Sequence, residues 1–170
     1  WFLPVTPGTK YITVGGAIAS DVHGKNHHNV GSFSVYVNWI EMLTADGSIV
    51  RCSRNRKPEL FYATCGGMGL TGIIVRASVR LISVPGARIE QTVIKSCNIE
   101  QTLELFDLHH KSTYSVAWID CLAKGKALGR SLIMLGEHAE GPFSKIKTQN
   151  KLPIRLLSHF LNRQTIGWFN

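Results

Sequence analysis

Several features that define common protein classes are missing from this chain of 170 residues. No apolar run approaches the roughly 18 residues needed to span a bilayer, and no signal peptide is recognisable. Neither GxGxxG nor the Walker pattern with Gly-Lys-Ser/Thr occurs. There is no internal repeat. With 44% hydrophobic and 18% charged residues, the chain is expected to be globular and not disordered.

The four cysteines show neither CxxC nor the spacing of metal ligands. They are Cys52, Cys65, Cys97 and Cys121. In a chain of this size we expect free thiols and no disulfide framework. Cys65 and Cys121 are expected to be buried small hydrophobes.

Acidic residues are few, and the formal net charge is +8. The basic residues are scattered, and the densest run, Arg51–Lys57, is typical of a solvated loop. No alternation of aromatic and basic residues suggests a single-strand nucleic-acid surface. The charge therefore favours an anionic ligand or a membrane surface over nucleic acid.

Hydrophobic patterning in the first half of the chain alternates with strong turn signals. Asp46-Gly47 between two apolar runs predicts a β-hairpin. The other expected elements are a strand at 10–15, a helical turn at 17–19, a strand from Phe33, a helix at 59–64 with Leu60, Phe61 and Ala63 inward, and one long strand at 70–84.

Pro85-Gly86 is the best candidate for a domain boundary, because the layout restarts after it. Asn98 and Gln101 resemble a capping box that begins a helix at 99–111. Strands are expected at 88–94, 114–120 and 129–135, and a short amphipathic helix at 152–161. The pattern predicts an α+β protein with an antiparallel sheet, divided into domains 1–85 and 86–170.

The stretch Thr13–His28 concentrates a glycine pair, a carboxylate, three histidines and a lysine. One interpretation is a metal site, since His23 and His27 have the i, i+4 spacing of helical zinc ligands. Gly24 and Asn26 disfavour that helix, however, and no HExxH glutamate is present. A second interpretation, a phosphate loop, is supported only by the glycine pair after the expected strand.

A third interpretation is a loop that lines a cofactor. Gly15 and Gly16 let backbone N–H groups approach a planar polar ring and steady negative charge on it. His23 and a neighbouring lysine would add positive potential. His27 and His28 are better explained as loop histidines hydrogen-bonded to backbone.

Four motifs together resemble a known family. They are Leu3–Thr9, Thr13–His28, Gly31–Phe33 and Gly66–Ile74. They resemble the FAD-linked oxidases of the vanillyl-alcohol-oxidase or PCMH-type superfamily. Within it the chain is most similar to the decaprenylphosphoryl-ribose 2-oxidases and their bacterial relatives, with a thinner likeness at 114–120.

The resemblance implies a fragment of a longer flavoprotein. Residues 1–85 would be the C-terminal half of a PCMH-type FAD-binding domain, and residues 86–170 the N-terminal part of an α+β substrate-binding domain. Both ends of the chain are expected to be cut. The preceding pyrophosphate loop and the following catalytic segment would lie outside it.

The resemblance also implies site residues, with FAD as a non-covalent cofactor and no metal. His23 and Lys25 would be catalytic, and Lys25 and Trp118 would contact substrate. The implied cofactor-binding residues are Gly8, Thr13, Val14, Gly15, Gly16, Ser20, Asp21, Val22, His23 and Ile74.

The implied activity is oxidation of a sugar CH–OH group by hydride transfer to flavin. The substrate would be a sugar or a polyprenyl-phosphoryl sugar such as lipid-linked ribose, an arabinan precursor of the cell wall. A reductase that completes the epimerisation is the partner the resemblance suggests. We expect at most peripheral membrane contact, in the cytoplasm or at the membrane. Two alternatives remain: a non-catalytic fragment with structural glycine loops, and a sugar-lactone oxidase of the same superfamily.

Overall fold

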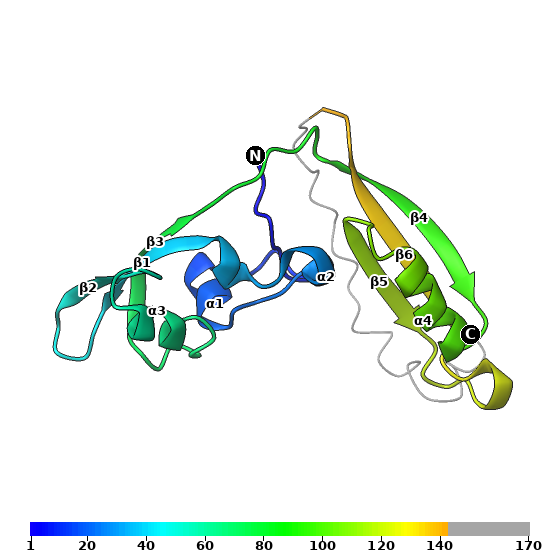
Figure 1. Ribbon diagram of the computed structural model, residues 1–170, viewed down its shortest axis with the longest axis horizontal. Coiled ribbons are helices and arrows are strands. Elements are labelled where there is room, and N and C mark those ends of the chain that lie inside the picture. The colour runs from blue at the N-terminus through cyan, green and yellow to red at the C-terminus, as the bar shows by residue number, and fades with distance from the viewer. Residues whose placement is uncertain (143–170) are drawn as a thin grey trace, which may run out of the picture. The chain divides into compact units, whose positions relative to one another are not determined.

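A computed structural model describes residues 1–142, which fold into two compact units (Figure 1). The first contains Trp1–Pro85 and a returning segment, His110–Ser115. The second contains Gly86–His109 and the described residues from Val116 onward. The division falls at the expected Pro85-Gly86 boundary, but the return of 110–115 to the first unit was not predicted.

A three-stranded antiparallel sheet forms the first unit, in the order β2-β1-β3. Strand β1 (Val37–Leu43) pairs with β2 (Ile49–Cys52) through the predicted hairpin, which is confirmed. Gly47 takes the positive φ of 81° that this turn needs. Hydroxyl groups of Thr44 and Ser48 donate to Asp46 and lower the pKa of its carboxyl to about 2.

Strand β3 (Ile73–Val79) is shorter than the predicted strand at 70–84. Gly69 and Gly72 have φ of 80° and 142°, so the chain turns before the strand begins. A Cβ on Gly72 would lie 2.5 Å from the carbonyl oxygen of Leu43. The glycine therefore permits close passage of the incoming chain beside β1.

Helix α1 (Val14–Ala19) replaces the strand predicted at 10–15, which is wrong. Thr13 is its N-cap, and its hydroxyl oxygen accepts the Gly16 N–H at 3.0 Å. This cap outweighs the low helix propensity of Gly15 and Gly16. The burial of Ala17 and Ile18 also favours a helix here. Packing stabilises a helix of this length more than propensity does.

The remaining helices of this unit are short. They are α2 (His27–Val30), the 3₁₀ helix η1 (Phe33–Tyr36) and α3 (Pro58–Thr64). The predicted strand from Phe33 thus begins four residues late. The helix predicted at 59–64 is confirmed, but Ala63 is exposed and Thr64 is buried in its place. The Thr64 hydroxyl donates to the carbonyl of Leu60, which satisfies it within the helix.

One hydrophobic core joins these elements. Its fully or nearly buried members are Val5, Ala17, Ile18, Phe33, Val37, Ile40, Met42, Cys52 and Phe61. The N-terminal segment thus contributes to the core through Val5, although it has no helix or strand of its own beyond an isolated bridge at Phe2. Because Val5 anchors this segment, the exposed loop that follows it starts from a fixed point.

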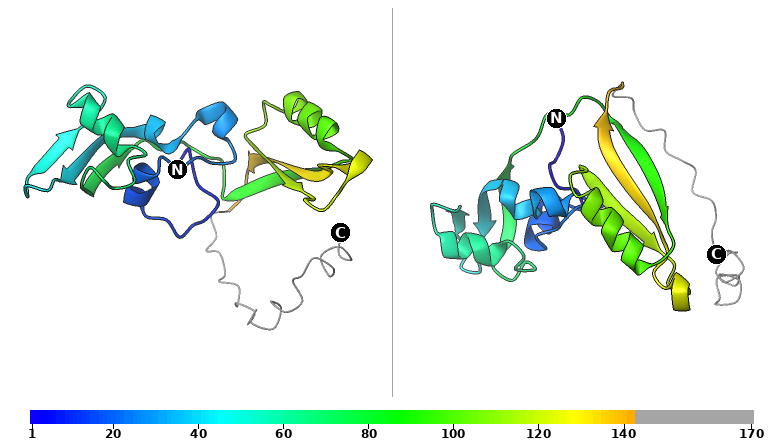
Figure 2. Two further views of the ribbon diagram at one scale, coloured as in Figure 1. Left: turned by 90° about the horizontal axis from the view of Figure 1, so that it is seen from below. Right: turned by 45° about the vertical axis from the view of Figure 1, so that its right-hand side comes forward.

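The second unit has the strand order β4-β6-β5. Its strands are β4 (Arg88–Ser96), β5 (Tyr114–Ile119) and β6 (Ser131–Ala139), and its helices are α4 (Ile99–Leu108) and η2 (Gly125–Ala127). Helix α4 lies along one face of this sheet (Figure 2). Antiparallel sheets with separate helices confirm the predicted α+β class.

The predicted start of α4 is confirmed in detail. The Asn98 side chain accepts the Gln101 N–H at 2.9 Å, and the Gln101 amide oxygen accepts the Cys97 N–H at 2.7 Å. The reciprocal bond goes one residue earlier than in a standard capping box. The helix predicted at 152–161 lies outside the described residues. None of the helices within residues 1–142 is long and apolar enough to cross a membrane.

All four cysteines are free thiols, as predicted. Cys52 is buried and Cys65 is half-buried. Cys121 is exposed, so its predicted burial is wrong. It lies in the turn that follows β5, where no helix or strand of residues 1–142 covers it. Cys97 is also exposed, just before α4.

Candidate functional site

The loop before α1 is almost wholly exposed. Gly8, Thr9, Lys10, Tyr11 and Thr13 are all exposed, and the Tyr11 side chain is 80% accessible. No atom lies within 4 Å of the position that a Cβ on Gly8 would take. An exposed loop that carries a large aromatic ring next to a buried anchor leaves a surface that a ligand can cover.

Backbone donors lie at the end of this loop. The N–H groups of Val14 and Gly15 open α1, so the helix offers them no acceptor. Neither has another hydrogen-bond acceptor among residues 1–142. Val14 is 49% exposed. Two adjacent donors beside exposed apolar surface suit a flat ligand with polar edges.

Ile74 of β3 lies against the same part of α1. Its Cβ is 3.7 Å from the position that a Cβ on Gly15 would occupy. Ile74 pairs with Met42 of β1, which fixes its position in the sheet. The structure therefore brings Ile74 close to Thr13 and Gly15, although about sixty residues separate Ile74 from them in the sequence.

Asp21 has a structural role in this region. Its carboxylate accepts the Ser34 N–H at 2.8 Å, the Ser32 hydroxyl at 2.9 Å and the Ser34 hydroxyl at 3.1 Å. Its φ is +40°, which turns the chain sharply after α1. The side chain is thus engaged inside the protein, and the predicted cofactor contact of Asp21 can come only from its backbone.

Ser20 and Val22 flank this turn. Ser20 is exposed, and its N–H donates to the Gly16 carbonyl. Val22 is half-buried, and its N–H and carbonyl bond to Ala17 and Phe33. Only the Ser20 side chain of this pair remains open to a ligand.

His23 and Lys25 are both exposed, on either side of Gly24. His23 forms an isolated bridge with Ser32, and its ring meets the His27 ring edge-on at 5.4 Å between centroids. No ion pair of Lys25 occurs within residues 1–142. The loop therefore presents one imidazole and one cationic side chain to solvent.

His28 has the backbone partner expected of it. Its Nε2 lies 3.1 Å from the carbonyl oxygen of Ser112, which also accepts the Asn29 amide at 2.8 Å. The Lys25 carbonyl accepts the Ser115 N–H at 2.9 Å. These bonds hold the returning segment in the first unit. No cluster of three or more His, Cys, Asp or Glu residues suited to a metal occurs in residues 1–142.

A second glycine turn, residues 65–70, forms hydrogen bonds with the end of α1. The N–H of Gly66 donates to the Ile18 carbonyl, and that of Met68 to the Ala19 carbonyl. A Cβ on Gly67 would lie 2.0 Å from the Ala63 carbonyl oxygen. The turn therefore caps the C-terminal end of α1, a role that the sequence did not reveal.

Burial raises the pKa of the Cys65 thiol to about 11, and the nearby Asp21 carboxylate adds to this effect. Cys65 opens the second glycine turn next to α3. At neutral pH it is a thiol and not a thiolate, so it is a poor nucleophile. Cys65 is accordingly a packing residue of the site wall.

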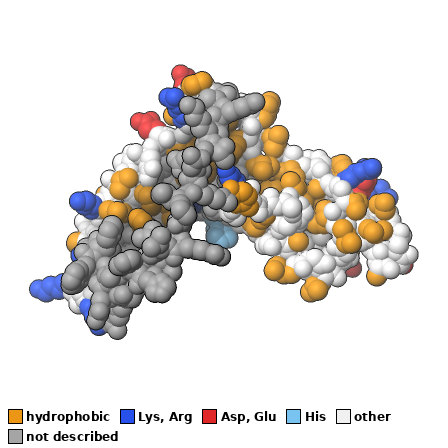
Figure 3. Space-filling view, turned by 180° about the vertical axis from the view of Figure 1, so that it is seen from behind, with side chains coloured by type: hydrophobic (Ala, Val, Ile, Leu, Met, Phe, Trp, Pro, Cys, Tyr) orange, Lys and Arg blue, Asp and Glu red, His pale blue; other side chains and the backbone are white. Residues whose placement is uncertain are grey.

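Exposed apolar side chains are frequent in the first unit; one face of the molecule, with such side chains in orange, is shown in Figure 3. They include Tyr62, Met68, Leu70, Ile73 and Val75. Met68 and Leu70 belong to the second glycine turn, and Leu70 is 91% accessible. The turn thus combines a backbone that is hydrogen-bonded to α1 with an exposed apolar surface.

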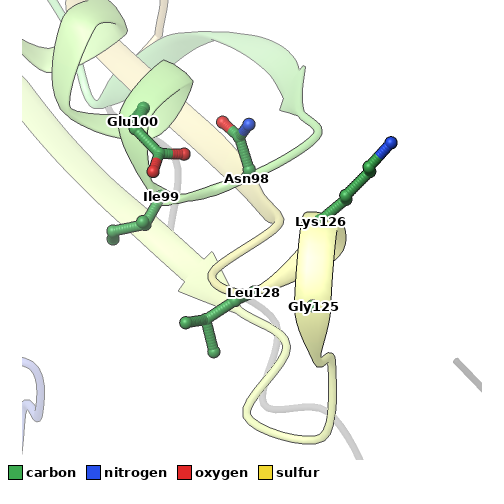
Figure 4. Close-up of a pocket in the computed structure, with 6 residues that line it drawn as sticks. All are labelled: Asn98, Ile99, Glu100, Gly125, Lys126 and Leu128. Carbon is green, nitrogen blue, oxygen red and sulfur yellow. The ribbon is translucent and has the colours of Figure 1, made fainter.

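Trp118 lies on β5 and is 75% exposed, in the second unit. The pocket found in that unit does not include it. That pocket has about 360 Å³ and lies where α4 begins, between Asn98, Ile99 and Glu100 and the η2 residues Gly125 and Lys126 (Figure 4). None of the predicted site residues lines it. The predicted substrate role of Trp118 stays a prediction.

Comparison with known proteins identifies the loop and α1. Residues 1–53 match the FAD-binding domain family. This match supports the resemblance to the FAD-linked oxidases with a PCMH-type flavin domain. It is 39% identical over 142 residues to decaprenylphosphoryl-beta-D-ribose oxidase of Mycolicibacterium smegmatis, covering 82% of this chain and 31% of that protein.

Two further relatives have different names. An uncharacterized protein in the mprA 5' region of Streptomyces coelicolor is 39% identical over 140 residues, or 82% of this chain and 38% of that protein. Delta(24)-sterol reductase of Rattus norvegicus is 38% identical over 82 residues, or 48% of this chain and 16% of that protein. The chain thus spans less than two-fifths of the length of each of these relatives.

FAD is the cofactor of this family, and the residues of the first unit fit it. The exposed loop from Gly8 to Thr13 leaves open space, and the N–H groups of Val14 and Gly15 are unpartnered in the described residues. Gly15 has no side chain to keep a flat ring away from those donors. The donor set is therefore that of a flavin wall formed mainly by backbone.

Proposed function

We propose that this chain is part of an FAD-dependent oxidoreductase that oxidises a CH–OH group of a sugar. The proposal rests on the exposed loop and the start of α1, where the N–H groups of Val14 and Gly15 have no acceptor among residues 1–142. Both lie inside the segment that matches the FAD-binding domain. FAD, when bound, supplies the hydride acceptor for such an oxidation.

The chain's own residues would bind and orient. Val14 and Gly15 would hold the ring edge through their N–H groups, and Gly8, Thr13, Gly16 and Ser20 would lie beside it. Ile74, on the rigid strand β3 next to Gly15, would contact the same part of the cofactor. Rigid elements hold reacting groups in position better than loops do.

Lys25 and His23 would provide the polar side chains. The Lys25 ammonium has no ion-pair partner within residues 1–142, so it is free to bind a hydroxyl or phosphate oxygen of the substrate. His23 would add a hydrogen-bonding imidazole next to it. The substrate we favour is a lipid-linked ribose, because the relative of 39% identity is named a decaprenylphosphoryl-ribose oxidase and the net charge of +8 suits a phosphoryl group.

Anaerobic mixing of the full-length protein with substrate tests the proposal. A polyprenyl-phosphoryl ribose should bleach the flavin absorption, whereas an aldonolactone should leave it unchanged. Bleaching by the lactone alone would favour the sugar-lactone oxidase. A full-length protein that stays colourless after FAD is added would support the non-catalytic alternative.

A further inference from the structure

Asn26 differs from its neighbours in the loop His23–His28. It is 2% exposed, whereas His23, Lys25, His27 and His28 are all exposed. Its amide Nδ2 donates to the carbonyl oxygen of Pro4 at 2.7 Å. Pro4 precedes the loop that contains Gly8. The bond therefore joins two exposed segments of the candidate FAD site through a buried contact.

Asn26 is not placed for stability alone. It occupies the N-cap position of α2, but its side chain makes no capping bond. Its Oδ1 is buried and is without a hydrogen-bond partner in residues 1–142. Asparagine at an N-cap ordinarily stabilises the helix, and an unpaired buried acceptor destabilises the fold. Asn26 therefore makes one bond to Pro4, while α2 lacks a side-chain cap and a buried acceptor stays unpaired within residues 1–142.

At Gly24 the loop His23–His28 packs closely against the N-terminal segment around Thr6. A Cβ on Gly24 would lie 2.6 Å from Asn26 Oδ1 and 2.8 Å from the Thr6 carbonyl oxygen. No side chain fits there, so the backbone at Gly24 rests directly on the backbone at Thr6. The amide of Asn26 closes this contact from the other side.

We propose that Asn26 is a positioning residue for the FAD site. By bonding to Pro4 it sets the distance between the exposed loop at Gly8 and the side chains of His23 and Lys25. It acts through these groups and does not itself touch the cofactor. The inference rests on the proposed function, because it assumes that FAD lies between the two segments.

The test uses Asn26→Asp and Asn26→Ser in the full-length protein. The aspartate keeps the shape but replaces the donor by an oxygen, and the serine hydroxyl is too short to reach Pro4. Each variant should raise the dissociation constant of FAD at least tenfold and shift the visible flavin absorption band. Asn55→Asp is the matched control, because the Asn55 side chain is exposed and makes no hydrogen bond within residues 1–142.

The pH dependence gives a second readout. A protonated aspartate can again donate to the Pro4 carbonyl, so the N26D variant should recover FAD affinity as the pH falls, whereas N26S should not. If N26D does not fold, N26S answers the question by its FAD affinity and flavin spectrum. Wild-type affinity and spectrum in both variants would overturn the inference. A wild-type protein that binds no FAD would instead overturn the proposed function.

Discussion

Glycines of this chain differ in what a side chain would meet. At Gly67 a Cβ would meet the Ala63 carbonyl at 2.0 Å, whereas at Gly15 it would meet only Ile74 at an ordinary 3.7 Å. Gly67 is therefore required by the fold. Gly15 lies in a helix with room for a methyl group, and glycine there costs about 0.5–1 kcal/mol relative to alanine. Its presence is better explained by a ligand.

A Gly15→Ala variant should separate stability from cofactor binding. We expect its free energy of unfolding to stay the same or rise by up to about 1 kcal/mol, because helix propensity improves without a clash. FAD affinity should fall, since the methyl group would enter the space between α1 and Ile74, both of which we assign to the cofactor site. Urea denaturation and FAD titration of the full-length protein measure the two effects. Unchanged FAD affinity would remove Gly15 from the site.

A Gly67→Ala variant should behave in the opposite way. The methyl group cannot fit beside the Ala63 carbonyl, so the turn that caps α1 must move, and we expect destabilisation of about 1–3 kcal/mol. Gly69→Ala is the control, because nothing lies within 4 Å of its Cβ position and only its φ of 80° opposes the change. Equal unfolding midpoints for the two variants would contradict this account.

The Cys65 thiol should react slowly. Its pKa of about 11, raised by burial and by Asp21, keeps it protonated at pH 8, whereas Cys97 and Cys121 are exposed. Iodoacetamide labelling followed by mass spectrometry should modify Cys97 and Cys121 well before Cys65. Because the folded pKa exceeds the ordinary 9.0, this thiol lowers stability only as the pH rises through 9 toward 11. Rapid labelling of Cys65 at pH 8 would contradict the raised pKa.

At the scale of elements, α1 depends on side chains outside it. Asp21 links its end to Ser32 and Ser34, and Gly66 and Met68 cap its last carbonyls. Arg54 fixes the neighbouring η1, since its guanidinium donates to the carbonyls of Ser34 and Val37. A six-residue helix is marginal alone, so these bonds determine where the backbone of the proposed FAD site lies.

An Asp21→Ala variant tests this dependence. Losing the acceptor of three hydrogen bonds should destabilise the full-length protein by about 2–3 kcal/mol, and Asp21→Asn should recover part of that loss. Thermal unfolding in the presence and absence of FAD measures it. Our account fails if D21A has the wild-type unfolding midpoint.

At the scale of the whole molecule, elements that depend on local sequence patterns could be predicted, whereas those that depend on contacts between distant segments could not. Asp46-Gly47 and the Asn98 cap act within a few residues, so the hairpin and the start of α4 were predictable. The helical turn expected at 17–19 is part of α1, but the first residues of this helix were mistaken for the end of a strand, because Gly15 and Gly16 have a low helix propensity. The packing of Ala17 and Ile18 outweighs that preference.

The residues of the candidate site also divide into those that the sequence indicated and those that only long-range contacts reveal. The resemblance provided Gly8, Thr13–Gly16 and His23, and the structure leaves their backbone or side chains open. Asn26 was missed because its partner Pro4 lies 22 residues away in sequence. The docking of His110–Ser115 on the first unit was missed for the same reason. Contacts between distant segments leave no local pattern.

The most direct test of the central claim is the FAD content of the full-length protein. The account predicts a yellow protein that binds about one FAD per chain and loses most of it when Thr13 to Gly16 is replaced by alanines. Alanine substitution of the exposed residues Asn55 and Arg56 should leave the flavin in place. A full-length protein that retains FAD fully after the first change, or never binds it, would contradict the assignment of this loop and α1 as a wall of the flavin site.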